Sequence, residues 1–284
     1  MTVPPVAHAT TAAPLAALLP ARQGKAWKVD PAPYGIRNIA TASRITDGRR
    51  ALIVVEEGNR VELFADRPDD FAITPDAVAA STDPASVAAL AARALRWILP
   101  GLDAGLMRTA TEDAANSADG LEECRRVLHH KGTVLTEFGF HLIDQGAHPM
   151  PREGGNGPVL EWTAASGAEW AVSSHGVGAN FSLVYEGPLS GLYGALPVLL
   201  PPLDTHTASG ASSAFARHLV SRFPQLQPAD DDMVEFGGHH DIGGWIALPE
   251  RAELGAPVSD ATRVCAEFGL VGIDFLLAVT THLL

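Results

Sequence analysis

From Glu153 to Ala216 the chain runs for 64 residues without a single Lys or Arg. Within this stretch, short apolar and aromatic runs are separated by Gly, Ser, Asn and Pro. The runs are Val159–Trp162, Glu169–Val172, Phe181–Tyr185 and Leu192–Tyr193. Because short runs bounded by turn residues are typical of strands, the pattern predicts an antiparallel sheet of roughly three to five strands.

The stretch from Val159 to Leu200 has only three charged side chains, those of Glu161, Glu169 and Glu186. An antiparallel sheet with one solvated face normally has polar side chains on that face. Either both faces are therefore buried within the monomer, or one face contacts a partner. Tyr and Trp are enriched at interfaces. The candidate binding-surface residues are Trp162, Trp170, Tyr185 and Tyr193.

The first half of the chain contains two clear local signals. Two β-rich runs, Ala51–Val55 and Val61–Ala65, flank Gly58-Asn59 and predict a hairpin. Asp83-Pro84 is a good helix start, because Asp caps free backbone N–H groups and Pro suits the first turn. Apolar residues recur at helical spacing from Val87 to Ile98, and Pro100-Gly101 is the expected stop.

The expected organisation has two lobes. Residues 1–35 are rich in Pro, Ala and Thr and predict a flexible N-terminal arm. A helix is predicted after Asp119, whereas the spacing at 133–144 fits a strand or a helix. Residues 146–158 are mostly turn residues and predict a linker. The first lobe would then span 36–145 and the second lobe 159–284.

The second lobe is expected to continue with a helix at about 209–223, strands at 233–236 and 245–248, and a long apolar helix from Ala261 to about His282. Strands followed by helices in each half predict the α+β class, with two related lobes as the preferred version. Val134–Asp144 and Val264–Asp274 agree at six of eleven positions, which leaves a duplication open. If the duplication is real, 133–144 is a helix like its counterpart.

Composition excludes several classes of function. The formal net charge is −13, and no Lys/Arg cluster of the kind that contacts phosphate backbones occurs, so we expect no nucleic-acid partner. The chain has no dinucleotide or phosphate-loop fingerprint, so no cofactor is predicted. We expect no membrane association, because the best apolar segment, 264–280, is interrupted by Glu267 and Asp274. The expected compartment is the cytoplasm.

The segment Glu235–Trp245 concentrates the most potential chemistry, because His239, His240 and Asp241 lie between two glycine pairs. Asp232 and its acidic neighbours precede the segment. His and Asp side chains can hold a metal or move protons, although the spacing matches no known metal motif. A polar turn explains the same residues, since Gly, Asp and His tolerate unusual backbone angles.

Two hypotheses follow. In the first, the protein is not an enzyme and acts by binding another protein or by self-association, through the low-charge sheet or the final apolar helix. In the second, it is a metal-assisted or acid–base hydrolase, with His239 or His240 as ligand or general base and Asp241 or Asp232 orienting it. A divalent metal is expected only in the second case.

Overall fold

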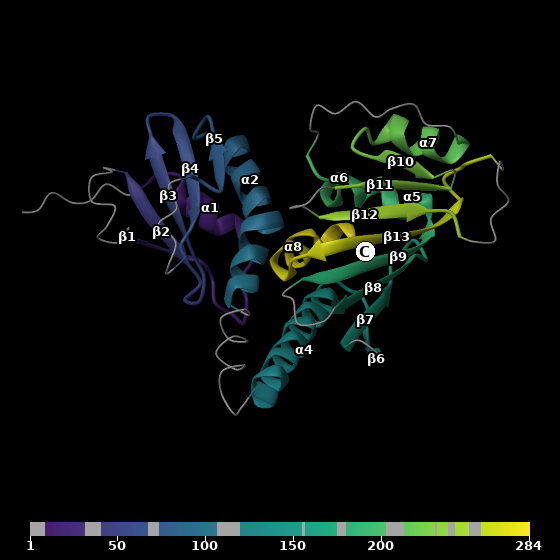
Figure 1. The fold of residues 1–284 in the computed structure, drawn as a ribbon, viewed down its shortest axis with the longest axis horizontal. Coiled ribbons are helices and arrows are strands. Elements are labelled where there is room, and N and C mark those ends of the chain that lie inside the picture. Colours follow the sequence, from purple (N-terminus) through teal and green to yellow (C-terminus); the bar gives the residue numbers. More distant parts are fainter. Residues whose placement is uncertain are drawn as a thin grey trace, which may run out of the picture. The chain divides into compact units, whose positions relative to one another are not determined.

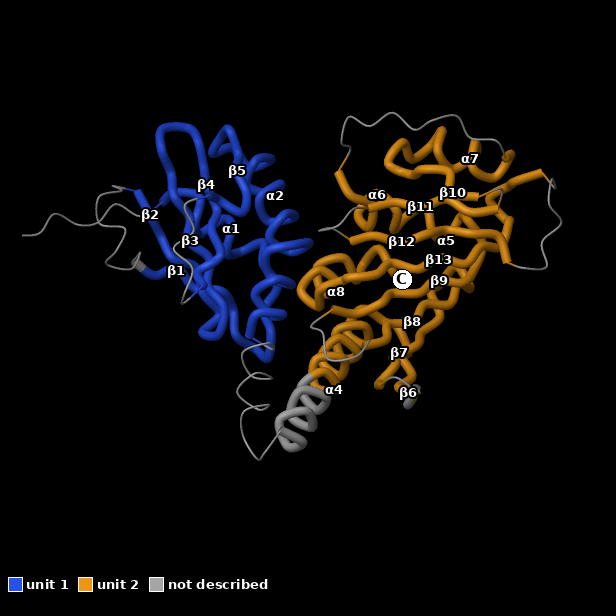
Figure 2. The backbone as a smooth tube through the Cα atoms, in the orientation of Figure 1, with its two compact units in different colours: residues 1–109 blue, residues 110–284 orange. Residues whose placement is uncertain are grey.

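The computed structural model describes residues 9–31, 41–67, 74–106, 120–154, 157–174, 180–202, 213–230, 232–237, 242–249 and 257–284. These residues form two antiparallel sheets with helices, which confirms the α+β class. The chain divides into two compact units, residues 1–109 and residues 110–284 (Figure 2).

Unit 1 contains a five-stranded sheet whose strands follow one another in chain order (Figure 1). The strands are β1 (Lys28–Pro31), β2 (Ala42–Thr46), β3 (Ala51–Glu57), β4 (Arg60–Ala65) and β5 (Ala77–Ala79). The predicted hairpin is confirmed as β3–β4: Glu57 pairs with Arg60, and Gly58 takes φ +62° in the two-residue turn between them. Such a turn favours Gly because L side chains rarely adopt this angle.

Two helical segments accompany this sheet. Helix α1 (Ala12–Leu18) precedes it. Helix α2 (Pro84–Arg93) starts as predicted, because the Asp83 carboxylate accepts a hydrogen bond from the Ser86 backbone N–H at 2.9 Å. A π-helical turn, η2 (Ala94–Ile98), follows α2, and the helix continues to Leu106. The buried face from Val87 to Ile98 is confirmed.

Two expectations for unit 1 are wrong. The helix passes through Pro100 instead of stopping there. Proline has no N–H to donate, and the π-helical turn just before Pro100 changes the backbone hydrogen-bond pattern at this point of the helix. The N-terminal arm is ordered over 9–31: Leu15 and Trp27 are buried and β1 pairs with β2. The Glu56 carboxylate also accepts hydrogen bonds from the backbone and side chain of Thr11, next to α1.

Unit 2 contains an eight-stranded antiparallel sheet in the order β10-β11-β12-β13-β9-β8-β7-β6. Its strands are β6 (Met150–Gly154), β7 (Gly157–Thr163), β8 (Glu169–Ser174), β9 (Phe181–Pro188), β10 (Gln227–Asp230), β11 (Met233–Phe236), β12 (Gly243–Ala247) and β13 (Arg263–Val271). Its helices are α4 (Gly120–Asp144), α5 (Leu189–Tyr193), α6 (Leu196–Leu199), α7 (Ala214–Arg222), α8 (Ile273–Val279) and the short η3 (Thr280–His282). Helix α4 packs on β7, and α7 packs on β10 and β11 (Figure 1).

The two halves of this sheet are related by a pseudo-two-fold axis. Each half is a helix followed by four strands in chain order, α4 with β6–β9 and α7 with β10–β13, and the halves meet where β9 pairs with β13. The cross-strand registers correspond: Trp170↔Tyr185 with Gly244↔Phe268, and Val172↔Leu183 with Ile246↔Ala266. The same equivalence holds between the central strands. Leu183 corresponds to Ala266 and Phe268 to Tyr185, and both Leu183↔Phe268 and Tyr185↔Ala266 are paired.

Some residues at equivalent positions of the two halves are identical. A constant offset from the helix into the first strand pairs Phe138 with Phe215, Leu142 with Leu219 and Pro151 with Pro228. The four helix residues are all buried. Pro151 and Pro228 lie opposite Leu160 and Val234, which correspond in turn. The two halves of unit 2 thus share strand order, cross-strand register and these three residues.

This correspondence is not the one that the sequence match indicated. Val134–Asp144 is part of α4, whereas Val264–Val271 belongs to β13, so that match joins a helix to a strand. Residues 133–144 are helical even though the supposed counterpart is not.

Three further expectations for unit 2 are corrected. The predicted linker contains β6 and the start of β7, because an edge strand tolerates the prolines that suggested a loop. The helix predicted from Ala261 is a strand up to Val271, where alternate residues are buried, and only then a short helix. The sheet has eight strands because its two halves join.

Candidate functional site

The four aromatic residues proposed as a binding surface do not form one. Trp162, Trp170 and Tyr185 are buried on the face of the sheet that the helices cover, and the Trp170 ring contacts the rings of the other two. The Trp162 indole donates a hydrogen bond to the Leu283 carbonyl at 3.0 Å. Tyr193 is half-buried, and its hydroxyl lies 2.7 Å from Nε2 of His218. These aromatic side chains therefore belong to the core of unit 2 and its margin.

Burial changes the acidity of the innermost tyrosine. Burial raises the pKa of Tyr185 to about 12, although the charge of Arg263 opposes the rise. The hydroxyl of Tyr185 donates a hydrogen bond to the Pro188 carbonyl. Tyr185 is therefore a neutral structural donor at physiological pH and not an activated nucleophile.

The opposite face of this sheet carries the charges that the β7–β9 sequence lacks. One row of paired residues crosses the sheet on this face: Met150, Glu161, Ala171, Val184, Glu267, Trp245, Glu235 and Gln227. Two of its three carboxylates, Glu235 and Glu267, come from the second half. The shortage of charge in the first half is thus partly made up by strands that are distant in the sequence.

The histidine segment stays untested. His239, His240 and Asp241 lie outside the described residues, whereas Asp232 lies in the turn between β10 and β11. Asp232 and Gly237 lie at opposite ends of β11. The extended strand therefore separates Asp232 from Gly237, the last described residue before the histidine segment, by about 17 Å along the chain. Among the described residues, no group of three or more His, Cys, Asp or Glu side chains could hold a metal.

A groove along α4 is a concave, largely apolar surface of unit 2. Its volume is about 830 Å³. We call it the α4–β6 groove; its walls are Gly132, Thr133, Leu135, Thr136, Gly139, Phe140 and Ile143 of α4, and Pro149, Pro151, Arg152, Pro158, Val159 and Leu160 of the β6–β7 side. Figure 1 shows α4 beside these two strands.

Large apolar side chains of the α4–β6 groove face solvent. Phe140 is 63% exposed and Ile143 is 52% exposed. Gly139 of α4 faces Leu160 of β7, and a Cβ at Gly139 would make an ordinary van der Waals contact with Leu160 at 3.5 Å. The Thr136 hydroxyl donates to the Gly132 carbonyl, so it needs no partner from outside the helix.

The correspondence between the two halves of unit 2 provides a comparison for this groove. By the offset that pairs Phe138 with Phe215, Phe140 corresponds to Arg217 and Gly139 corresponds to Ala216. The exposed aromatic side chain of the first half is therefore a charged one in the second half. Since both helices bury the equivalent face, packing within the unit does not require Phe140 to be apolar.

Charge at the groove comes from one wall residue. Among the described wall residues Arg152 is the only ionisable one, and its guanidinium contacts the Glu161 carboxylate at 3.0 Å. Thr133 and Thr136 are its other polar walls, and the remaining described walls are apolar residues and glycine. Sequence reasoning missed it, although apolar residues on two faces of the 133–144 helix were a signal.

Pro84–Leu106 is the one helix in the described ranges with the length and apolar composition to cross a membrane, and just over half of that segment is buried in the protein. A buried core helix passes the same test, so these properties do not assign a membrane span. No family model, curated protein or solved structure matches the chain.

Proposed function

We propose that the protein is a non-enzymatic binding protein whose α4–β6 groove takes up an amphipathic helix of a partner protein. The observation that carries the proposal is the exposed pair Phe140 and Ile143, three residues apart on α4, beside an apolar groove. Exposed apolar patches next to such a groove mark interaction sites on soluble proteins. Protein binding was the first hypothesis from the sequence, and the proposed surface is now a different one.

The edge strand favours a helix over a strand as the occupant. An added strand needs a continuous row of backbone N–H and C=O groups. Pro151, in the middle of edge strand β6, has no N–H to donate, and Pro149 precedes the strand. A helix satisfies its own backbone and needs only apolar contacts from the groove. Arg152 at the groove suits an acidic residue on the polar side of such a helix.

Photo-crosslinking from inside the groove tests the proposal. A photoreactive phenylalanine analogue replaces Phe140 in cells of the native host, and the same analogue replaces Arg217 as the matched control, because Arg217 is the equivalent position of the second half. We expect a crosslinked protein at 140 and not at 217. The purified partner should bind the natural chain, and Phe140→Arg should abolish that binding.

Each alternative outcome is distinguishable. A crosslink between two copies of this chain would show that the groove serves self-association and does not take up a helix of another protein. Equal crosslinking at 140 and 217 would contradict a specific groove. Phe140→Arg should leave the melting temperature unchanged, because the side chain is mostly exposed and the other half carries Arg at this place. A variant that fails to fold would show instead that Phe140 is structural.

A further inference from the structure

Unit 1 contains a polar pocket built from three separate chain segments. Its walls are Arg22, Gln23, Lys25, Asp47, Arg49, Arg50 and Asp103. The residues come from the turn at 22–25, the loop between β2 and β3, and the helix that follows η2. Four walls are cationic and two are anionic, so the pocket has a surplus of two positive charges.

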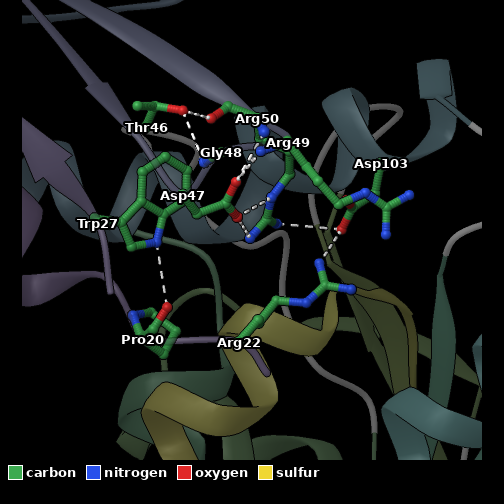
Figure 3. Close-up of polar contacts among 9 residues, drawn as sticks. All are labelled: Pro20, Arg22, Trp27, Thr46, Asp47, Gly48, Arg49, Arg50 and Asp103. Carbon is green, nitrogen blue, oxygen red and sulfur yellow. Dashed lines mark hydrogen bonds and ion pairs between the residues drawn. The ribbon is translucent and has the colours of Figure 1, made fainter. Parts of the chain in front are cut away.

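The two carboxylates are already used inside the protein (Figure 3). Asp47 accepts hydrogen bonds from the backbone N–H groups of Arg49 and Arg50 and, at 2.7 Å, from the Arg50 guanidinium. Asp103 accepts from Arg22 at 2.8 Å and from Arg50 at 3.3 Å. Burial alone would raise the pKa of Asp47, but the Arg50 N–H and guanidinium groups outweigh it and lower the pKa. The Asp47 carboxylate is therefore ionised at neutral pH.

The remaining cations, Lys25 and Arg49, have no ionic partner in the described part of the chain. Both side chains are exposed at the pocket. Lys25 follows a turn in which Gln23 and Gly24 both take positive φ. Arg49 follows Gly48, which takes φ +92°. The two backbone turns thus present both cations at one opening.

The scaffold beneath the opening is rigid. The Arg50 side chain is 2% exposed and lies 5.2 Å over the ring of Trp27. The Trp27 indole in turn donates to the Pro20 carbonyl at 3.2 Å, as Figure 3 shows. These groups are fixed before any ligand arrives, so the conformational entropy lost on binding is limited to the exposed side chains of Lys25 and Arg49.

The charge distribution of the chain also points to this unit. Residues 1–109 carry 12 basic and 11 acidic side chains, whereas residues 110–284 carry 8 and 22. A pocket with surplus positive charge in a chain of net charge −13 is a local exception to its acidity. We infer that this pocket binds a small oxyanion, with the phosphate group as the ligand class. Arg and Lys are the side chains that bind phosphate best, through charge-assisted hydrogen bonds.

Titration of the full chain with inorganic phosphate, with a sugar phosphate monoester and with acetate tests the inference. Binding is followed by NMR shifts of the backbone amides of 22–25 and 47–50. We expect saturable binding of phosphate, the monoester or both, and weaker binding of acetate. Preference for the monoester over inorganic phosphate would identify a phosphorylated small molecule as the source.

The variant Lys25→Gln/Arg49→Gln should weaken phosphate binding by about tenfold or more, because it removes two charge-assisted donors. The matched control Lys28→Gln/Arg60→Gln removes two exposed cations outside the pocket and should leave binding unchanged. Equal loss in both double variants would mean nonspecific attraction and overturn the inference, as would the absence of saturation in the natural chain. Arg49 and Lys25 are exposed, so the variant should fold normally.

Discussion

Val184 and Glu267 face each other on the central strands of unit 2, and the pseudo-two-fold axis of the eight-stranded sheet passes through this pair. The rungs next to this pair correspond, as Leu183↔Phe268 does with Tyr185↔Ala266, whereas the register shift between Phe268 and Val271 occurs on one side only. The two halves differ in their side chains, and these differences provide internal controls for mutagenesis.

Phe138 and Phe215 should be equivalent in stability measurements. Both are buried on the inner face of a helix that packs on the sheet. We expect Phe138→Ala and Phe215→Ala each to lower the free energy of unfolding by about 3–5 kcal/mol. Phe140→Ala, on the exposed side of α4, should cost under about 1 kcal/mol. Urea titrations of the three variants measure this, and a large effect at Phe140 would place it in the core.

Gly191 should tolerate no side chain while Tyr185 is present. A Cβ at Gly191 would lie 2.7 Å from the Tyr185 hydroxyl oxygen and 2.9 Å from the Ser166 hydroxyl oxygen. We expect Gly191→Ala to destabilise the protein by about 1–3 kcal/mol through overpacking. Tyr185→Phe removes one of the clashing atoms. The double variant Gly191→Ala/Tyr185→Phe should therefore lose less free energy of unfolding than the sum of the losses in the two single variants. Strict additivity in thermal melts would contradict this contact.

The Glu56 carboxylate should make unit 1 sensitive to acid. Burial tends to raise the pKa of Glu56, but hydrogen bonds from Thr11 and Thr10 outweigh it, and the pKa lies below 4.5. A lowered pKa in the folded state stabilises the protein above the unfolded pKa, and this stability is lost as the pH falls through the folded value. Glu56→Gln should therefore cost on the order of 2 kcal/mol at pH 7 and much less in strong acid. Unfolding curves at a series of pH values show whether the two proteins converge.

Tyr185 should ionise only in strong base. With its pKa raised to about 12, the folded state keeps it protonated after an exposed tyrosine has ionised. The sign is opposite to that of Glu56: stability falls as the pH rises above the unfolded value of 10, because the unfolded chain then loses the proton more readily. Tyrosinate absorbance of the natural chain and of Tyr185→Phe, recorded as pH rises, isolates this group. If the absorbance step that Tyr185→Phe abolishes occurred near pH 10, the raised pKa of Tyr185 would be contradicted.

Adjacent arginines should differ sharply in their contribution to stability. The Arg50 side chain is buried and contacts both Asp47 and Asp103, so Arg50→Met removes the main partner of Asp47 and the longer of the two arginine contacts of Asp103. We expect a loss of about 3–5 kcal/mol, as for a broken buried ion pair. Arg49→Met is the matched control and should change stability by under about 0.5 kcal/mol, because Arg49 is exposed. Similar losses for both would mean that the cluster is solvated.

Local signals explain which elements the sequence predicted correctly. The β3–β4 hairpin follows from Gly58 in a two-residue turn, and the start of α2 follows from the Asp83 cap. Both depend on residues within a few positions of each other. The α+β class was also predictable, because alternation and helical spacing occur in separate segments.

Long-range pairing explains the failures. Val264, Ala266 and Phe268 fit a strand by alternation, yet the apolar run around them also fits a helix, and only pairing with β9 and β12 decides. The prolines of 146–158 indicated a loop because the sequence does not reveal that β6 is an edge strand. The α4–β6 groove was missed for the same reason: the exposure of Phe140 depends on which face of α4 the sheet covers.

The strand order of unit 2 has a consequence for how the chain folds. Among the described strands of this sheet, every pairing joins neighbours in the chain except the pairing of β9 with β13. Hairpins between neighbours form quickly, whereas joining residues as distant as Leu183 and Phe268 requires closing a long loop. We therefore expect two four-stranded intermediates that dock late in refolding, with the rate-limiting barrier at the centre of the sheet.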